Sequence, residues 1–137
     1  MTKKTLQLGL VVLAALLWAA PVRAQATRDA EGRTVRVTKD SAGRVQSRTV
    51  LNADGSRHIT SHEYWPESTV ARHTLDQDVD AAGRQTRRVA QEFDDHGRVL
   101  ERRELNVDPA GKERGTRTRY SYDPQGQRHE ETSPLKQ

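Results

Sequence analysis

Histidine and carboxylate side chains are the residues of this sequence that could hold a metal ion. His58, His62 and Glu63 have a spacing that chelates zinc when it lies on a helix. On a strand, however, two residues four apart lie about 13 Å from each other and cannot share one ion. We therefore interpret both histidines as half-exposed strand residues.

A group of aspartates offers a second possible metal chemistry. Asp94 and Asp95, with Asp76, Asp78 and Asp80 nearby in the sequence, carry the oxygen ligands that calcium prefers. Capping of turns and pairing with arginine across strands explain the same residues better. The sequence has no cysteine, no glycine-rich phosphate loop and no nucleophile elbow. We predict that the protein is not an enzyme and that it has no metal site and no cofactor.

Arginine and aromatic side chains are the remaining candidates for contacts with a partner. The stretch 84–119 is rich in arginine and could meet an anionic glycan or nucleic acid, but acidic residues are interleaved with its arginines. A solvated sheet face with salt bridges is the interpretation that we favour. The candidate binding residues are Tyr64, Trp65, Phe93, Tyr120, Tyr122, Arg98, Arg102, Arg117 and Arg119.

A recurring turn must position these side chains. Its pattern is Asp-x-x-Gly followed by Arg, Lys or Gln, at 29–33, 40–44, 80–84, 94–98, 108–112 and 123–127. Asn52 begins a seventh copy, and a degenerate eighth falls at 64–68. Asp or Asn in first place bonds its own backbone, and Gly in fourth place tolerates a positive φ. Each copy is therefore predicted to reverse the chain between two antiparallel strands.

The numbering of the apolar residues predicts which side of the sheet is apolar. Across a bulged turn of this kind, the numbers of paired residues add to an even number, so odd residues stay on one face. Most large apolar residues of the repeat region are odd-numbered, namely Val35, Val37, Val45, Leu51, Ile59, Leu75, Val79, Val89, Phe93, Val99, Leu105 and Val107. Even positions collect arginine and carboxylates, so the pattern predicts a one-sided antiparallel meander.

The same rule predicts individual cross-strand pairs. It places Phe93 opposite Val99, Leu75 opposite Val89, and Arg88 opposite Glu104, all of them favourable couples. Tyr120 and Tyr122 are exceptions, and a bulge at Gly115 could flip their strand. Val50 and Leu100 are exceptions that the rule leaves without an explanation.

The first 24 residues have the features of a secretory signal peptide. Two lysines precede an apolar run from Leu8 to Ala20, and small residues stand before the expected cleavage after Ala24. The run is shorter than the roughly 20 residues of a membrane anchor, so we expect no membrane span after cleavage. Once Lys3, Lys4 and Arg23 are removed, 20 of the 23 basic residues remain, and the chain has 19 acidic ones. This balance gives no reason to expect nucleic acid.

These observations predict the division of the chain. Residues 1–24 form the signal peptide, 25–129 a β-hairpin repeat domain, and 130–137 a flexible tail. Large apolar residues are too few for a thick core, so backbone pairing must carry much of the fold. The predicted fold class is all-β, an antiparallel meander of repeated hairpins in an open or partly curled sheet. The predicted location is the periplasm of a bacterial cell or the medium outside it.

Two segments resemble a known repeat. Residues 119–127 read Arg-Tyr-Ser-Tyr-Asp-Pro-Gln-Gly-Gln and residues 93–100 read Phe-Asp-Asp-His-Gly-Arg-Val-Leu. They are similar to the Tyr-Asp repeat of the Rhs/YD-repeat family, Tyr-x-Tyr-Asp-x-x-Gly-Arg-Leu. In that family the repeats build long β-sheets that coil into shells or bind carbohydrate and protein partners at bacterial surfaces. Here most copies have Val or Leu in place of Tyr and the repeats are shorter, so the resemblance implies a sheet-like interaction module.

Two functions follow as expectations. The first is an exported, non-enzymatic interaction module that uses its sheet to bind an unknown envelope or extracellular protein, or a second copy of itself. The alternative is a binder of envelope glycan or another polyanion through the arginine-rich stretch 84–119. Because an uncovered apolar face favours association, we expect contact through the odd face, centred on Val89, Phe93, Val99 and Leu105.

Overall fold

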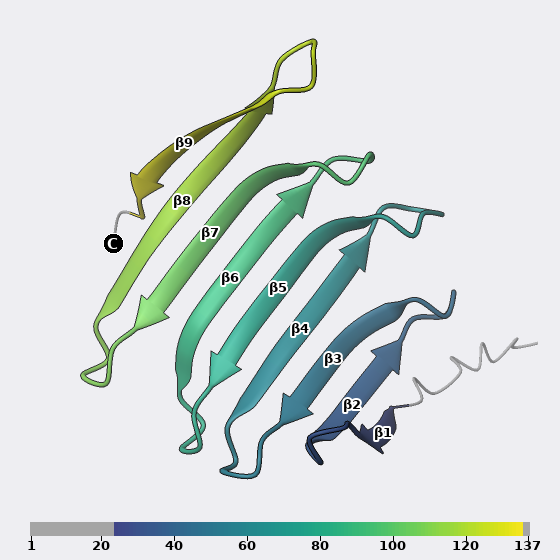
Figure 1. Ribbon diagram of the computed structural model, residues 1–137, viewed down its shortest axis with the longest axis vertical. Helices are drawn as coiled ribbons and strands as arrows, with labels where there is room; N and C mark the ends of the chain where they lie inside the picture. The colour runs from purple at the N-terminus through teal and green to yellow at the C-terminus, as the bar shows by residue number, and fades with distance from the viewer. Residues whose placement is uncertain (1–23, 136–137) are drawn as a thin grey trace, which may run out of the picture.

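The described residues, 24–135, form one nine-stranded antiparallel sheet in a computed structural model, and each strand pairs with the next one in the sequence (Figure 1). The strands are β1 (Gln25–Arg28), β2 (Thr34–Lys39), β3 (Val45–Leu51), β4 (Arg57–Tyr64), β5 (Ala71–Val79), β6 (Gln85–Phe93), β7 (Val99–Val107), β8 (Glu113–Tyr122) and β9 (Arg128–Pro134). No helix occurs in this part of the chain. The predicted all-β antiparallel meander is confirmed, and the sheet is open. The predicted signal peptide lies outside the described residues, apart from Ala24.

The repeated turns have the predicted geometry. Glycines of the seven regular copies have φ between 75° and 87°, a region that glycine enters without steric cost. In the copy at 94–98, the Gly97 amide donates to the Asp94 carbonyl at 3.1 Å. The Asp94 carboxylate accepts the amides of His96 and Arg98 at 3.0 and 2.9 Å. In the degenerate turn Glu67 takes the positive φ, at 54°.

The turns lie in two rows at opposite ends of the strands (Figure 1). We call 40–44, 65–70, 94–98 and 123–127 the upper turn row. The lower turn row consists of 29–33, 52–56, 80–84 and 108–112. Two strands of sequence lie between consecutive turns of one row. Side chains of neighbouring turns can therefore be close in space and far apart in the sequence.

A second irregularity follows four of the turns and was not predicted. The pairing register shifts by one residue near the ends of the β2–β3, β4–β5, β5–β6 and β6–β7 pairs. The residues skipped by the pairing are Gln46, Arg72, Thr86 and Leu100. Each skipped residue is an extra residue of a bulge, which changes the face on which the following side chains lie. Leu100 is one of them. It was left unexplained by the rule that odd residues stay on one face, which we call the odd–even rule.

Because of these shifts, the odd–even rule fails for β2–β3, β5–β6 and β6–β7. Phe93 pairs with Val99 as predicted. The other two predicted pairs are wrong, since Leu75 pairs with Ala90 and Arg88 pairs with Leu105.

The shift between β2 and β3 explains another exception. Even-numbered Val50 pairs with odd-numbered Val35, so the two valines share a face. The predicted bulge at Gly115 is also wrong, because the β7–β8 register is regular from Val107↔Glu113 to Glu101↔Arg119.

Register and side-chain alternation assign the apolar residues to two faces. The valine face carries Val35, Val50 and Val89. The leucine face carries Leu51, Ile59, Leu75, Val79, Ala90 and Leu105. The predicted odd face centred on Val89, Phe93, Val99 and Leu105 therefore does not exist, because Val89 and Leu105 point to opposite sides.

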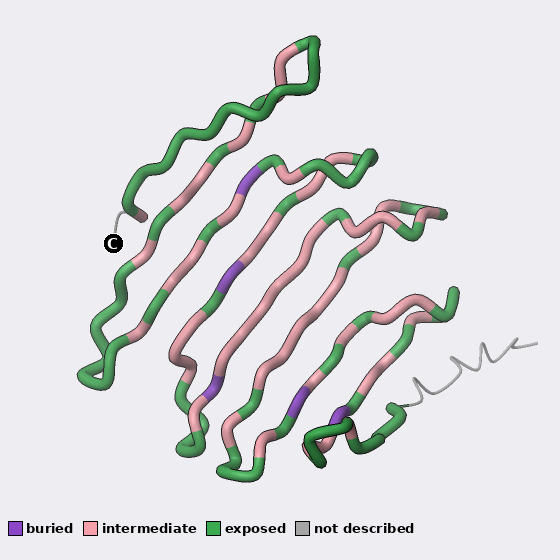
Figure 2. The backbone as a smooth tube through the Cα atoms, viewed as in Figure 1, coloured by how far each residue is buried: buried purple, intermediate pink, exposed green. Residues whose placement is uncertain are grey.

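The core is thin, as predicted. The buried apolar side chains are Val35, Val50, Val79 and Val89, and no described side chain is fully buried. Figure 2 shows the buried residues spaced singly along different strands. Val89 is only 4% exposed although its partners across the two neighbouring strands are Asp76 and Glu104. The stems of long polar side chains can cover isolated valines in this way, so a single layer suffices.

The C-terminal segment differs from the prediction. Residues expected to fray from 130 onwards instead form β9, which pairs with β8 as far as Thr116↔Pro134. Leu135 extends the contact, since its amide donates to the Gly115 carbonyl at 2.9 Å. A Cβ atom at position 115 would lie 2.7 Å from Leu135 Cδ1 and 2.9 Å from the Glu104 carbonyl oxygen. Leu135 therefore lies on the leucine face and closes over Gly115.

We expect Gly115→Ala to destabilise the fold by about 1–2 kcal/mol, because the added methyl group overpacks this contact. The double change Gly115→Ala with Leu135→Ala should lose less than the two single changes add up to. The urea midpoint of unfolding measures both effects. Strict additivity of the two changes would contradict the contact between Leu135 and Gly115.

Candidate functional site

The four tyrosine and tryptophan candidates from the sequence are packed against arginine. In each case a guanidinium carbon lies 4.6–5.7 Å from the ring centroid, a distance at which cation–π attraction operates. The pairs are Arg44 with Tyr64, Arg72 with Trp65, Arg98 with Tyr122 and Arg128 with Tyr120. Each of these rings therefore has an arginine partner within the chain, and their contact with another molecule stays a prediction.

Two of the pairs form the same three-part unit, which we call a tyrosine lock. In the first, Arg44 Nε donates to Asp40 Oδ2 at 2.7 Å. The guanidinium then lies over the Tyr64 ring at 4.6 Å, and the Tyr64 hydroxyl donates to the Val45 carbonyl at 2.7 Å. The lock ties the turn at 40–44 to the next turn of the upper row.

The second lock repeats this geometry further along the same row. Arg98 Nε donates to Asp94 Oδ2 at 2.7 Å, and its guanidinium lies 4.9 Å from the centroid of the Tyr122 ring. The Tyr122 hydroxyl donates to the Val99 carbonyl at 2.8 Å. In both locks the accepting carbonyl belongs to the residue directly after the turn arginine. Tyrosine before the turn thus has a structural use in this chain.

The arginine-rich stretch forms two ion-pair clusters, and one is centred on Glu101. This residue is 8% exposed and lies on the leucine face, opposite Arg119. Its carboxylate accepts hydrogen bonds from Arg103 Nε and, at 2.6 Å, from Arg117 Nη2. Arg119 Nε lies 3.5 Å away. Burial raises the pKa of the Glu101 carboxyl, but the bonds from Arg117 and Arg103 outweigh it and hold the pKa below the usual range.

The other cluster is centred on Glu104, on the valine face. Its carboxylate accepts a bond from Arg87 Nε at 2.9 Å, and Arg102 Nη2 lies 2.6 Å from it. The bond from Arg87 is the main reason that the pKa of the Glu104 carboxyl lies below its usual value. The interpretation of the arginine-rich stretch as a salt-bridged surface is confirmed for Arg102, Arg117 and Arg119.

The remaining candidates take separate positions. Arg98 belongs to the second lock. Phe93, the last residue of β6, lines a shallow groove of about 450 Å³ together with Trp65 and Leu100. The structure therefore brings Trp65 and Phe93 together and keeps both apart from Tyr120, which stacks under Arg128 near the β9 edge.

The histidines and aspartates have partners inside the sheet. His58 Nδ1 lies 2.6 Å from Asp78 Oδ1, and the His62 ring stacks on Tyr64. Asp94, Asp95 and His96 bring possible ligand atoms within 4.8 Å of one another. Asp94 already accepts bonds from its turn amides and Arg98. Turn capping, the interpretation that we favoured, is confirmed for Asp80 and Asp94.

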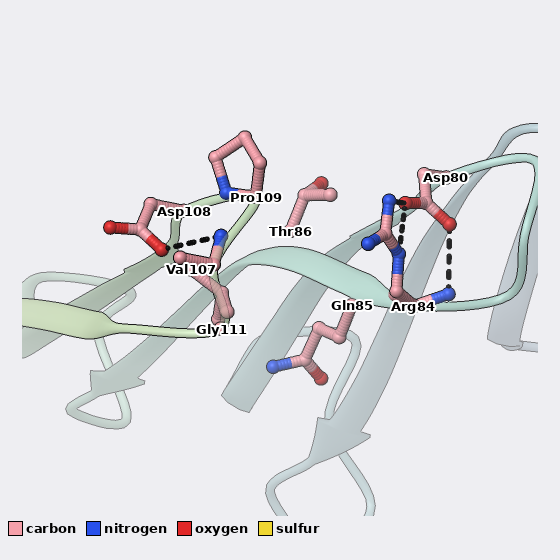
Figure 3. Close-up of a pocket in the computed structure, with 9 residues that line it drawn as sticks. Asp80, Arg84, Gln85, Thr86, Val107, Asp108, Pro109 and Gly111 are labelled. Atoms are coloured by element: carbon pink, nitrogen blue, oxygen red, sulfur yellow. Dashed lines mark hydrogen bonds and ion pairs between the residues drawn. The ribbon is translucent and has the colours of Figure 1, made fainter.

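A second groove lies in the lower turn row, between the turns 80–84 and 108–112 (Figure 3). It has a volume of about 470 Å³. Its lining includes Asp80, Arg84, Gln85, Thr86, Val107 and Pro109. Sequence reasoning missed both this groove and the tyrosine locks. The signal for a lock was present, namely tyrosine just before one turn and arginine closing the preceding turn of the same row.

Comparison with known proteins gives no family. No protein-family model matches the chain, and no curated protein matches it. The similarity to the Tyr-Asp repeat therefore stays a prediction from residues 93–100 and 119–127. Within residues 24–135, no helix has the length and apolar character needed to cross a bilayer.

Proposed function

We propose that the protein is a non-enzymatic binding module that acts after export, and that the leucine face is its binding surface. Apolar side chains gather on this face in a band from β3 to β7, which Leu135 continues over Gly115 of β8, and no second layer formed by residues 24–135 covers it. Leu51, in this band, is 38% exposed. An uncovered band of this kind marks an interaction surface in soluble proteins.

Charged side chains on the same face indicate what the surface binds. Arg57 and Arg88 lie toward the lower turn row, and Glu63 and Glu92 lie at the upper ends of the same two strands. All four are exposed. Among the described residues, Arg57, Arg88 and Glu63 have no ion-pair partner, and Glu92 lies 3.9 Å from Arg103. Positive and negative charges are thus separated along β4 and β6.

This separation fits a second copy of the chain, packed face to face with its strands reversed. A two-fold axis between the two sheets, at right angles to the strands and crossing β5 near its middle, would bring Arg57 of one copy toward Glu63 of the other, and Arg88 toward Glu92. The same axis places Leu75 and Ala90, which pair across β5 and β6 near the middle of both strands, over the same residues of the second copy. Six strands of about seven residues span roughly 700 Å², close to the roughly 800 Å² per partner of a stable interface.

Charge reversal tests this proposal. We expect the mature chain, residues 25–137, to form dimers, and Arg57→Glu with Arg88→Glu to weaken the dimer at least tenfold, because like charges then meet across the interface. Adding Glu63→Arg and Glu92→Arg to the same chain should restore the dimer. Sedimentation equilibrium measures the dissociation constants, and Arg48→Glu on the valine face is the matched control.

Two outcomes would contradict self-association. One is a wild-type chain that remains monomeric at about 100 µM, and the other is a four-fold variant that does not recover. A monomer that binds an anionic glycan with an affinity falling steeply as salt rises would instead support the polyanion alternative. The structure gives that alternative less support, because Glu101 and Glu104 already pair with several arginines of the stretch 84–119.

A further inference from the structure

The lower turn row contains a turn that has two of the three parts of a tyrosine lock. Arg84 Nε donates to Asp80 Oδ2 at 2.8 Å, as Arg44 and Arg98 do in their own turns. No ring of the described residues lies over Arg84, whose side chain is 67% exposed, compared with 25% for Arg44 and 52% for Arg98. The guanidinium is held in place but its face is uncovered.

The strand register explains why the third part is missing. Continuing the β3–β4 register past Ser47↔Ser61 places Tyr64 directly across from Arg44. The β7–β8 register places Tyr122 across from Arg98 in the same way. Along β6–β7, the bulge at Leu100 shifts the pairing, so that the residue across from Arg84 is Pro109, inside the next turn. The strand β7 ends before it reaches Arg84, and its last residue is Val107.

The space left open is the groove of about 470 Å³ between these two turns. Figure 3 shows Asp80 and Arg84 at one end of the groove, Val107 and Pro109 at the other, and Thr86 between them. Its volume lies within the roughly 300–1,000 Å³ of small-ligand sites, which is ample for one aromatic ring. The Gln85 carbonyl holds the place that the Val45 and Val99 carbonyls hold in the two complete locks, directly after the turn arginine.

We propose that this groove binds a tyrosine side chain of another polypeptide and so completes a third lock. The ring lies on the Arg84 guanidinium against Val107 and Pro109, and the phenol hydroxyl donates to the Gln85 carbonyl. The ring must come from another molecule, because all three tyrosines of the chain already lie under arginines. This site lies between two turns of the lower row, and none of the residues named for the proposed self-association lines it.

The interaction is measurable with a minimal probe. N-acetyl-tyrosinamide, titrated into the isotope-labelled mature chain, should shift the amide resonances of Gln85, Thr86 and Gly111, with a dissociation constant on the order of 1 mM for so small a contact. Arg84→Gln should weaken binding at least fivefold while the remaining resonances keep their positions. Val107→Tyr, which puts a ring into the groove from within, should block the probe. Arg48→Gln, an exposed arginine on the valine face, is the control that leaves binding unchanged.

Related probes separate the parts of the proposal. N-acetyl-phenylalaninamide lacks the hydroxyl and should bind more weakly than the tyrosine compound. N-acetyl-leucinamide, which has no ring, should not shift these resonances. Equal binding of all three compounds, unchanged affinity in Arg84→Gln, or no shift at either turn at about 20 mM probe would each overturn the proposal. The charge-reversed monomer Arg57→Glu with Arg88→Glu should still bind the probe, so failure of self-association leaves this test intact.

Discussion

Replacing Glu101 with glutamine is expected to cost the fold about 2–3 kcal/mol, a large share of the stability of a small domain. Glu101 is 8% exposed and its carboxylate contacts Arg103, Arg117 and Arg119. Glutamine keeps the size but removes the charge, so three guanidinium groups of one sheet face repel each other without a counter-charge. This expected loss of stability is smaller than the loss on breaking a fully buried ion pair, because Arg119 is 61% exposed and solvent screens its charge.

The matched control is Glu130→Gln on β9, an exposed glutamate 3.8 Å from Arg128. This change should alter the urea midpoint little, as exposed pairs contribute about 0–1 kcal/mol. Similar losses for the two variants would show that the Glu101 cluster does not hold β7 to β8. Raising the salt concentration should lower the stability of the wild type more than that of Glu101→Gln, since the variant has lost the screened attraction.

We expect the free energy of unfolding to fall as the solution is made acidic, because many carboxyl groups of the fold are stabilised in their charged form. The pKa values of the carboxyls of Asp29, Asp40, Asp54, Asp80, Asp94, Glu101 and Glu104 lie below their ordinary values of 3.8 and 4.5. At Asp80 the leading cause is the bond from the Arg84 amide, whereas at Asp94 burial opposes bonds from Arg98 that outweigh it. The turns and both glutamate clusters therefore contribute to the same pH dependence.

The direction of the effect follows from proton uptake. Each of these groups binds protons more weakly when folded, so the unfolded chain takes up protons first as the pH falls. The stabilisation is complete above the unfolded pKa values, near pH 5, and is lost as the pH falls through the folded ones. The urea midpoint should be constant from pH 6 to 8 and should fall steeply between pH 5 and 3.

A variant isolates the contribution of one turn. Asp94→Asn keeps an oxygen that can cap the turn amides but loses the charge on which Arg98 depends. Its stability should be lower at pH 7 and should depend less on pH below 5. A wild-type midpoint that is constant down to pH 3 would contradict the role of these carboxylates.

The local chemistry of the turns could be predicted from the sequence, and the faces of the sheet could not. Asp94 and Gly97 have side-chain and φ requirements that the sequence shows directly, so the turns and the strand order were predicted correctly. The faces depend on the extra residues Gln46, Thr86 and Leu100, which have no distinguishing type. A one-residue bulge reverses every side chain beyond it, and this reversal separated Val89 from Leu105.

The partners of the candidate tyrosines within the chain could not be predicted, for a related reason. Tyr64 and Tyr122 were expected to be available to a partner because aromatic residues often anchor interfaces. In the structure they contact Arg44 and Arg98, which lie 20 and 24 positions earlier in the sequence. Contacts of this kind depend on turns of the same row standing side by side, which in turn depends on the register of two intervening strands.

Site-specific cross-linking tests face-to-face association most directly. The chain has no cysteine, so Gln77→Cys places a single thiol on the leucine face of β5, close to the proposed two-fold axis. Thr74→Cys places one on the valine face of the same strand. With a short bismaleimide at about 100 µM protein, the concentration of the equilibrium test, Gln77→Cys should give a covalent dimer in high yield and Thr74→Cys should remain monomeric. Equal cross-linking of both variants, or of neither, would contradict a dimer formed through the leucine face.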